Sequence, residues 1–296
     1  MLLASIDIGT NSTRYLLAEV TDCTVETIKS GLITTRLGQG INGGELLPEA
    51  MERTIIAIEQ FLTEIKPLQP RELLAVATSA VRDAVNQEEF LQRVQQRTGI
   101  TVQVLSGEAE AAASYRGVLA GLAVEASTTM VLDVGGGSTE MIWPVGQGIE
   151  FVSLPAGAVR MTEGGHSEEQ IKQLLLPTLQ RVRSSQGQKR SLVAVGGTAT
   201  TLAAMSLGLA KYRPELVHGH YLPYVEVVRL LDVLEAAGYE GRKNIVGLQP
   251  ERADIIIAGA TLVKIALEVL QLKGLTISES DILQGLVVTM YQKLSK

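Results

Sequence analysis

The amino-acid sequence predicts an α/β protein made of two duplicated domains, each with a mostly parallel sheet. Its 296 residues suggest two domains or one large one. A motif Asp-x-Gly-x-x-Ser-Thr stands at residues 7–13 and again at 133–139. A second pair of matching segments, each a short apolar run that enters a turn of small residues, stands at 74–79 and 193–198. Two matches in the same order favour a duplication over a chance likeness of one turn.

The composition excludes several classes of protein. Hydrophobic residues make up 46% of the chain and charged residues 20%, as is typical of a folded globular protein. The longest apolar run, 255–263, is too short to span a bilayer, and the single Cys23 cannot form an internal disulfide. Because the first residues lack the features of a secretory signal, we expect a cytoplasmic protein with no membrane partner. The net charge of −6 argues against nucleic acid as a partner.

The first half of the chain predicts a hairpin followed by helices. Residues 6–16 contain strand-forming residues on both sides of a glycine-containing turn, which predicts an antiparallel hairpin. Pro48 marks a helix start, and apolar residues at helical spacing continue to Ile65, before Pro67 ends the run. Asn86, followed three residues later by Glu89, predicts a capping box at the start of the next helix.

The second half repeats the hairpin at 132–142 and adds longer helices. Ser167 with Gln170 predicts a capped helix, 251–272 predicts a buried helix, and the end of the chain predicts an amphipathic one. We place the domain boundary so that residues 1–123 form the first domain and 124–296 the second. The final helix, 280–296, is able to pack back on the first domain.

The two repeated turns have the composition of phosphate-binding loops. Glycine lets the backbone approach a ligand closely, and consecutive turn amides with a nearby hydroxyl can bind an anion. Asp7 and Asp133 stand at the end of each preceding strand. A carboxylate repels phosphate, so these two residues are better suited to hold a divalent cation or to order a water. The alternative interpretation is an ordinary hairpin turn in which Asp and Ser bond their own backbone.

Two further patterns carry less weight. Residues 38–43 match the dinucleotide-binding pattern G-x-G-x-x-G, but no acidic ribose partner accompanies them. His218 and His220 have no nearby cysteine, so a place in the wall of the cleft or a structural hydrogen bond is a better interpretation for this pair than zinc binding.

Taken together, the motifs resemble the exopolyphosphatase and guanosine pentaphosphate phosphatase family. The likeness covers nearly the whole chain in the right order. Its main segments are 7–12, 35–38, 77–84, 133–140 and 196–201, and it continues at 157–160, 217–220, 251–254 and 281–286. The resemblance implies two ribonuclease-H-like domains of the actin superfamily that enclose a phosphate-binding cleft. It also implies the short, two-domain form of the family, since the chain ends soon after residue 286.

The resemblance implies roles for particular residues. The catalytic base is Glu110, which aligns with the second of the family's two adjacent glutamates. Ala109 stands in place of the first, and Glu108, displaced by one position, is the alternative. Because the substrate is strongly anionic, we also expect Asp133 and Glu140, with Asp7 opposite, to be ligands of a metal or of its bound water, and Mg²⁺ or another divalent cation suits such oxygen ligands. The residues expected to bind phosphate come from the two loops, from two arginines and from the second small-residue turn: Gly9, Thr10, Asn11, Ser12, Arg14, Arg82, Gly135, Gly136, Gly137, Ser138, Thr139, Gly196, Gly197 and Thr198.

The function that follows is removal of the terminal phosphate of inorganic polyphosphate, and also of guanosine pentaphosphate, by water. In this reaction the two loops hold the phosphate chain from both sides while the carboxylate orients the attacking water. Homodimer formation is compatible with this interpretation. Two other functions remain open: an ATP-dependent kinase that acts on a small hydroxyl compound, and a non-catalytic, nucleotide-sensing, actin-like protein.

Overall fold

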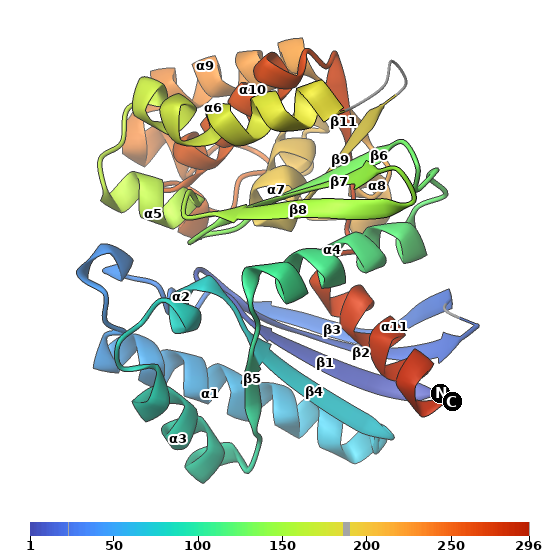
Figure 1. The fold of residues 1–296 in the computed structure, drawn as a ribbon. Coiled ribbons are helices and arrows are strands. Elements are labelled where there is room, and N and C mark those ends of the chain that lie inside the picture. The colour runs from blue at the N-terminus through green and yellow to red at the C-terminus, as the bar shows by residue number, and fades with distance from the viewer. Residues whose placement is uncertain (23, 186–189, 296) are drawn as a thin grey trace. The chain divides into compact units, whose positions relative to one another are not determined.

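A computed structural model describes residues 1–22, 24–185 and 190–295, and Cys23 therefore lies outside the described part of the chain (Figure 1). The chain divides into two compact units. The first unit consists of Met1–Gly121 together with Ser280–Lys296, and the second consists of Leu122–Glu279. The α/β class and the two-unit architecture agree with the fold predicted from the sequence.

The first unit contains a five-stranded sheet with the order β3-β2-β1-β4-β5. β1, β2 and β3 pair antiparallel, whereas β4 and β5 run parallel to β1. The buried strand β1 is therefore central, and its carboxyl end opens into the first glycine loop. The strand bounds are β1 Leu2–Ile8, β2 Thr13–Thr21, β3 Thr24–Ile33, β4 Glu72–Ala77 and β5 Val102–Val104.

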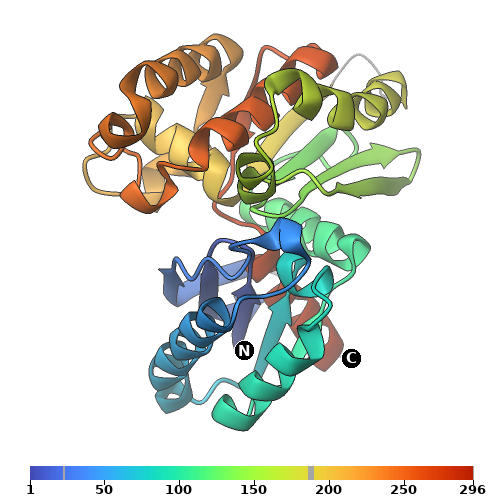
Figure 2. The same cartoon turned by 90° about the vertical axis from the view of Figure 1, so that its left-hand side faces the viewer.

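Helices cover both faces of the first sheet. α1 (Pro48–Ile65) has a proline in its first turn and buries one apolar face, as the spacing of its apolar residues predicts. It lies beside α3 (Gln87–Thr98) on one face of the sheet (Figure 2). On the other face, α4 (Gly107–Gly121) and α11 (Ile282–Leu294) pack on each other and share one buried apolar cluster with β1 and β2. A four-residue helix, α2 (Ser79–Arg82), follows β4.

The contact between α4 and α11 depends on two glycines. A Cβ atom on Gly117 of α4 would collide with the backbone carbonyl of Asp281, and one on Gly285 of α11 would collide with that of Ala113. Each helix therefore presents a glycine where the backbone of the other comes closest. The last segment of the chain is held against the first unit in this way.

The second unit contains a six-stranded sheet with the order β10-β11-β9-β6-β7-β8. β6, β7 and β8 pair antiparallel, and β9 and β11 continue the sheet in parallel. This is the strand order of the first unit with one added edge strand, β10, so the predicted duplication of the hairpin extends to the whole sheet. The bounds are β6 Thr129–Val134, β7 Thr139–Val145, β8 Gly148–Leu154, β9 Ser191–Val195, β10 Tyr221–Pro223 and β11 Gly274–Ile277.

The helices of the second unit enclose a separate apolar core. Residues of α6, α7, α9 and α10 pack with the buried faces of β6, β7 and β9, and the indole ring of Trp143 is fully buried among them. Figure 1 shows α6, α9 and α10 side by side over this sheet. The bounds are α5 Ala158–Glu163, α6 Glu168–Ser185, α7 Gly196–Ser206, α8 Pro214–Val217, α9 Tyr224–Arg242 and α10 Ile256–Leu270.

Two local predictions were wrong and one is confirmed. The Asn86 side chain makes no capping hydrogen bond to α3; instead it exchanges two hydrogen bonds with the backbone of Leu46, which holds the preceding loop. The helix predicted over 251–272 is interrupted, because a 3₁₀ turn at Pro250–Arg252 precedes α10. The Ser167–Gln170 capping box is confirmed by reciprocal hydrogen bonds of 2.8 and 3.3 Å.

No helix in the described part of the chain is long and apolar enough to cross a membrane.

The glycine contact between α4 and α11 gives a prediction about stability. Gly117→Ala should lower the free energy of unfolding by about 1–3 kcal/mol, because the new methyl group must push the backbone of residue 281 away. Thermal or urea unfolding measures this change. Gly43→Ala is the matched control, since a Cβ there meets no atom within 4 Å. Equal stability of the two variants would contradict the proposed packing constraint.

Candidate functional site

The first glycine loop joins β1 to β2 and is closed by its own backbone. The amide of Gly9 donates to the carbonyl of Ser12 over 3.1 Å, and a Cβ on Gly9 would lie only 2.9 Å from that oxygen. Two more amides support the loop from outside: Arg36 donates to Asn11 O and Gly38 to Thr10 O, both over 2.8 Å. The loop is thus fixed through its carbonyl oxygens.

The second glycine loop, between β6 and β7, has the same construction. Gly135 donates to the carbonyl of Ser138 over 3.0 Å. The segment that follows β8 supports this loop, since the amide of Ala158 donates to Gly135 O and the guanidinium of Arg160 to Gly137 O, at 2.9 and 2.8 Å. Arg160 therefore has a structural role in this loop.

Both loops leave amide donors for a ligand. Among the hydrogen bonds of the described residues, none is donated by the amides of residues 10–12 or 136–138. Because consecutive unpaired amides favour an anion, each loop is suited to bind phosphate oxygens. The first loop is not an ordinary turn in which Asp bonds its own backbone. Its Asp7 carboxylate is bonded to an arginine side chain.

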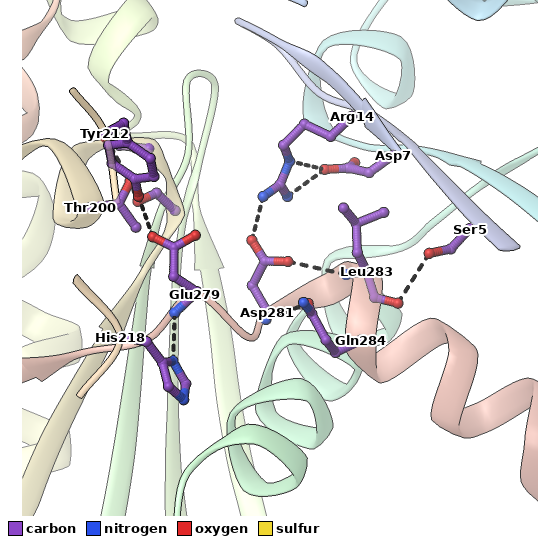
Figure 3. Close-up of polar contacts among 12 residues, drawn as sticks. Ser5, Asp7, Arg14, Thr200, Tyr212, His218, Glu279, Asp281, Leu283 and Gln284 are labelled. Carbon is purple, nitrogen blue, oxygen red and sulfur yellow. Dashed lines mark hydrogen bonds and ion pairs between the residues drawn. The ribbon is translucent and has the colours of Figure 1, made fainter. Parts of the chain in front are cut away.

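Asp7 belongs to a buried group of three charged residues in the first unit (Figure 3). Arg14, its partner across the β1–β2 pair, donates from Nε and Nη2 to the single oxygen Oδ2 of Asp7, at 3.2 and 2.7 Å. Nη1 of Arg14 donates to Oδ2 of Asp281, at the start of α11. Oδ1 of Asp7 is buried and has no hydrogen-bond partner among the described residues.

The charges of this group shift two pKa values. Burial raises the pKa of Asp7 although the neighbouring Arg14 opposes the shift. Burial alone would lower the pKa of Arg14, but the charges of Asp281 and Asp7 outweigh it and raise that pKa, so the guanidinium stays charged. In the described structure Arg14 is thus occupied by two carboxylates.

Glu110 lies in the first turn of α4 and is 8% exposed. Its carboxylate Oε2 accepts a hydrogen bond of 2.7 Å from Nη1 of Arg82, which follows β4. The same nitrogen donates to the carbonyl of Leu105 over 3.1 Å, so the backbone fixes the arginine in turn. The structure brings these two predicted site residues together, whereas Glu108 on the same helix is exposed.

The corresponding charged pair of the second unit consists of two carboxylates. Asp133 and Glu140 are cross-strand partners in the β6–β7 register, as Asp7 and Arg14 are in the first unit. Glu140 is 1% exposed and accepts a hydrogen bond of 2.6 Å from Ser153 Oγ. Among the described residues no three His, Cys, Asp or Glu side chains form a ready-made metal site.

The helix α7 begins at the predicted small-residue turn. Gly196 has a φ of +87°, and a Cβ there would lie 3.0 Å from Oδ1 of Asp133, so glycine allows this carboxylate to lie against the helix start. The guanidinium of Arg252 lies so close to Gly197 that a side chain there would collide with it. The helix N-terminus and the arginine both favour an anion. The Thr198 side chain instead packs against Gly259 of α10.

Comparison with known proteins identifies the family. The model of the Ppx/GppA phosphatase family matches residues 16–294, nearly the whole chain. The chain belongs to the Ppx/GppA phosphatase family. The resemblance that the motifs predicted is thereby confirmed. Asp7 and the first loop lie just before the matched range.

Relatives of this family member differ in length. Exopolyphosphatase 2 of Mycobacterium tuberculosis is 30% identical to this chain in sequence. The match covers 97% of this chain and 98% of that protein. A bifunctional 3-dehydroquinate synthase/phosphatase of Fusobacterium nucleatum is 31% identical, and a guanosine-5'-triphosphate,3'-diphosphate pyrophosphatase of Vibrio vulnificus is 29% identical. The match to the Fusobacterium protein covers 97% of this chain but only 46% of that protein. The match to the Vibrio protein covers 99% of this chain but only 60% of that protein.

A solved structure supports the family fold. The crystal structure of the Aquifex aeolicus Ppx/GppA family member has a TM-score of 0.82 and 32% identity, and the comparison covers 100% of this chain and 99% of the other. This comparison includes the first loop, which the family model leaves out.

Several contacts of this Ppx/GppA family member were not foreseen from the sequence. Asp281 begins the segment 281–286, and Asp281 followed three residues later by Gln284 is a capping-box pattern that predicts a helix start. Glu279 accepts from the hydroxyl of Tyr212, and burial and this carboxylate raise the pKa of the phenol (Figure 3). His218 Nδ1 accepts from the amide of Glu279 over 3.1 Å, which confirms its predicted structural hydrogen bond.

The hydroxyl groups of the loops are partly occupied within the protein. Asn11 Nδ2 donates to Ser12 Oγ over 3.2 Å. The hydroxyl of Thr139 donates to the carbonyl of Ala156, so in the described structure it holds the segment after β8 rather than pointing to a ligand. This arrangement favours the loop amides over the Thr139 hydroxyl as phosphate donors.

This arrangement predicts that Thr139→Val lowers stability. The substitution leaves the carbonyl of Ala156 without its donor in a buried place, which should cost about 1–3 kcal/mol of unfolding free energy. Chemical denaturation measures the change. Thr128→Val removes a hydroxyl whose hydrogen bond to the carbonyl of Glu125 is exposed to solvent, and it should change stability by less than about 0.5 kcal/mol. Unchanged stability of Thr139→Val would contradict this structural role of the hydroxyl.

Proposed function

We propose that this protein is a phosphohydrolase that releases the terminal phosphate of inorganic polyphosphate. The observation that carries the proposal is the buried carboxylate of Glu110, bonded to Arg82 in a unit that also holds a glycine loop with unpaired amides. An oriented carboxylate beside phosphate-binding groups is the arrangement needed to activate water against a terminal phosphoryl group.

Glu110 acts as the base in this reaction. The oxygen of a water molecule attacks the terminal phosphorus and a water proton passes to the carboxylate, while the bond between phosphorus and the bridging oxygen breaks and the shortened chain leaves. Arg82 keeps Glu110 in one orientation, since the 2.7 Å ion pair is itself anchored on Leu105 O. Because Glu110 is buried and Glu108 exposed, the structure favours Glu110 as the base.

The substrate oxygens are bound by the loops. The amides of residues 10–12 and 136–138 donate to phosphate oxygens, with the start of α7 as a further anion-binding group. Side chains of the loops and Arg82 add donors when a substrate is bound, and Arg14 acts mainly by holding Asp7. That the two loops hold one phosphate chain from both sides stays a prediction of the sequence.

A magnesium ion fits the residues that are present. Mg²⁺ prefers oxygen ligands and is often bound by one or two carboxylates together with waters and substrate phosphates. Asp133 and Glu140 form such a neighbouring pair in the second unit and would hold the ion, which would supply positive charge to offset the charge of the phosphate chain. In the first unit, Asp7 has a buried oxygen with no hydrogen-bond partner among the described residues, so this carboxylate is a separate candidate ligand.

The lengths of the relatives favour polyphosphate as the first substrate to test. The chain matches almost the whole length of a relative named exopolyphosphatase. It matches only 60% of the length of the relative named guanosine-5'-triphosphate,3'-diphosphate pyrophosphatase. Guanosine pentaphosphate is the second substrate. Location in the cytoplasm and homodimer formation stay predictions.

The role of Glu110 is tested by Glu110→Gln. Loss of the base should lower phosphate release from polyphosphate by about two to four orders of magnitude, because glutamine cannot accept the proton. Phosphate release is measured with magnesium on long polyphosphate, short polyphosphate, guanosine pentaphosphate and ATP.

Glu108→Gln is the matched control, on the same helix turn but exposed, and its activity should stay within a few-fold of the wild type. Full activity of a folded Glu110→Gln variant would remove Glu110 from the mechanism. If the wild-type protein released no phosphate from any substrate but transferred it from ATP to a hydroxyl compound, the kinase interpretation would replace this one.

Removal of divalent cations tests the metal. Chelation with EDTA should abolish phosphate release, and added Mg²⁺ should restore it, because the substrate carries roughly one negative charge per phosphoryl unit beside several carboxylates. Full activity after chelation and dialysis would contradict the assignment of the carboxylates to a cation.

A further inference from the structure

The group formed by Asp7, Arg14 and Asp281 is nearly enclosed in the first unit. Asp7 is 5% exposed and Asp281 is 4% exposed, and the arginine side chain between them is 24% exposed. Two carboxylates share one guanidinium, so with both ionised the group carries one excess negative charge. An unpaired buried charge costs free energy, so it is expected to have a further partner, such as a ligand.

Each oxygen of the Asp281 carboxylate has its own partner (Figure 3). Oδ1 accepts from the amide of Leu283 over 3.1 Å and caps α11, while Oδ2 accepts from Nη1 of Arg14. The side chain of Gln284 completes the cap by accepting from the amide of Asp281 over 3.0 Å. The rotamer of Asp281 is therefore fixed by the helix, and the helix fixes where Arg14 is held.

The position of Arg14 decides which oxygen of Asp7 stays available. Because Nη1 is bonded to Asp281, the other edge of the guanidinium meets Asp7, and both Nε and Nη2 donate to Oδ2. Oδ1 is buried and has no partner in the described part of the chain, and it lies beside the start of the first glycine loop. Oδ1 is thus the oxygen of Asp7 that can take a further partner.

The helix that Asp281 caps, α11, is held against two elements of the site, the strand β1 and the helix α4. Ser5, two residues before Asp7 and on the same face of β1, donates from Oγ to the carbonyl of Leu283 over 3.1 Å. Through Gly117 and Gly285, α11 also packs tightly on α4, the helix that carries Glu110. The start of α11 therefore contacts the strand of Asp7 and the helix of the proposed base.

We infer that Asp281 is a positioning residue for the reaction: through Arg14 it fixes the Asp7 carboxylate so that Oδ1 faces the reacting phosphate, its water or its cation. This inference rests on the proposed function. Groups that orient a ligand through one intermediate residue commonly change activity by about 10- to 100-fold when they are removed.

The test is Asp281→Asn in the full-length protein. Asparagine keeps the side-chain oxygen that caps α11 but removes the charge that holds Arg14. We expect kcat for polyphosphate to fall by about 10- to 100-fold while KM stays within about threefold, because orientation of Asp7 matters in the transition state. Gln284→Ala is the matched control, since it weakens the same cap and leaves the ion pairs with Arg14 intact.

A double-mutant cycle separates positioning from a structural effect. If Asp281 acts through Asp7, adding Asp281→Asn to an Asp7→Asn variant should cause no further loss of kcat. Arg14→Lys, which cannot bridge both carboxylates, should reproduce the effect of Asp281→Asn, and it serves as the second variant if Asp281→Asn does not fold.

The outcomes are distinct. A wild-type protein that releases no phosphate contradicts the proposed function itself. With an active wild type, three results overturn the inference: kcat of Asp281→Asn within twofold of the wild type, independent losses in the double variant, or an equal loss in Gln284→Ala. A folded Arg14→Lys protein whose kcat equals that of the wild type would overturn the inference as well.

Discussion

A carboxylate at the end of a buried strand, beside a loop suited to bind anions, is the constraint on which the rest of this site depends. Asp7 and Asp133 both stand there, and neither can approach phosphate without a compensating charge. In the first unit the compensation comes from Arg14, which is held by the last helix of the chain. In the second unit a second carboxylate, Glu140, takes the same position. Two neighbouring carboxylates are the kind of ligand that a divalent cation prefers.

The two repeats therefore share a construction and differ in charge. Both loops are closed by the same Gly to Ser backbone hydrogen bond, and both are supported by amides of the segment that follows the third strand. The repeated sheet order shows that the duplication includes all five strands of the first unit. At the hairpins the two repeats differ in their charged side chains, with a cation–anion pair at 14 and 7 and an anion pair at 140 and 133. The same hairpin thus carries an ion pair in the first unit and two neighbouring carboxylates in the second.

The proposed base depends on packing at some distance from it. α4 holds Glu110 in its first turn, and further along the same helix Gly117 allows α11 to approach closely. Because α11 also begins with Asp281, one helix contact limits the positions of both Glu110 and Arg14. Glu110 itself is held by Arg82, which links the helix to the end of the fourth strand.

The sequence by itself determined the duplication, the two loops and the family, because these depend on local residue patterns: glycine at tight turns, period-two strands and a repeated Asp-to-Ser spacing. It could not decide the partners of the charged residues. Arg14, Arg82 and Thr139 were all expected to bind phosphate, and the tertiary structure bonds them to Asp7 and Asp281, to Glu110 and to the carbonyl of Ala156. Asn86 has a helix-capping sequence, yet its side chain holds a loop 40 residues away. A side chain chooses among hydrogen-bond partners of similar strength according to which groups the fold brings within 3 Å, and residues 14 and 281 meet only because the last helix packs on the first sheet.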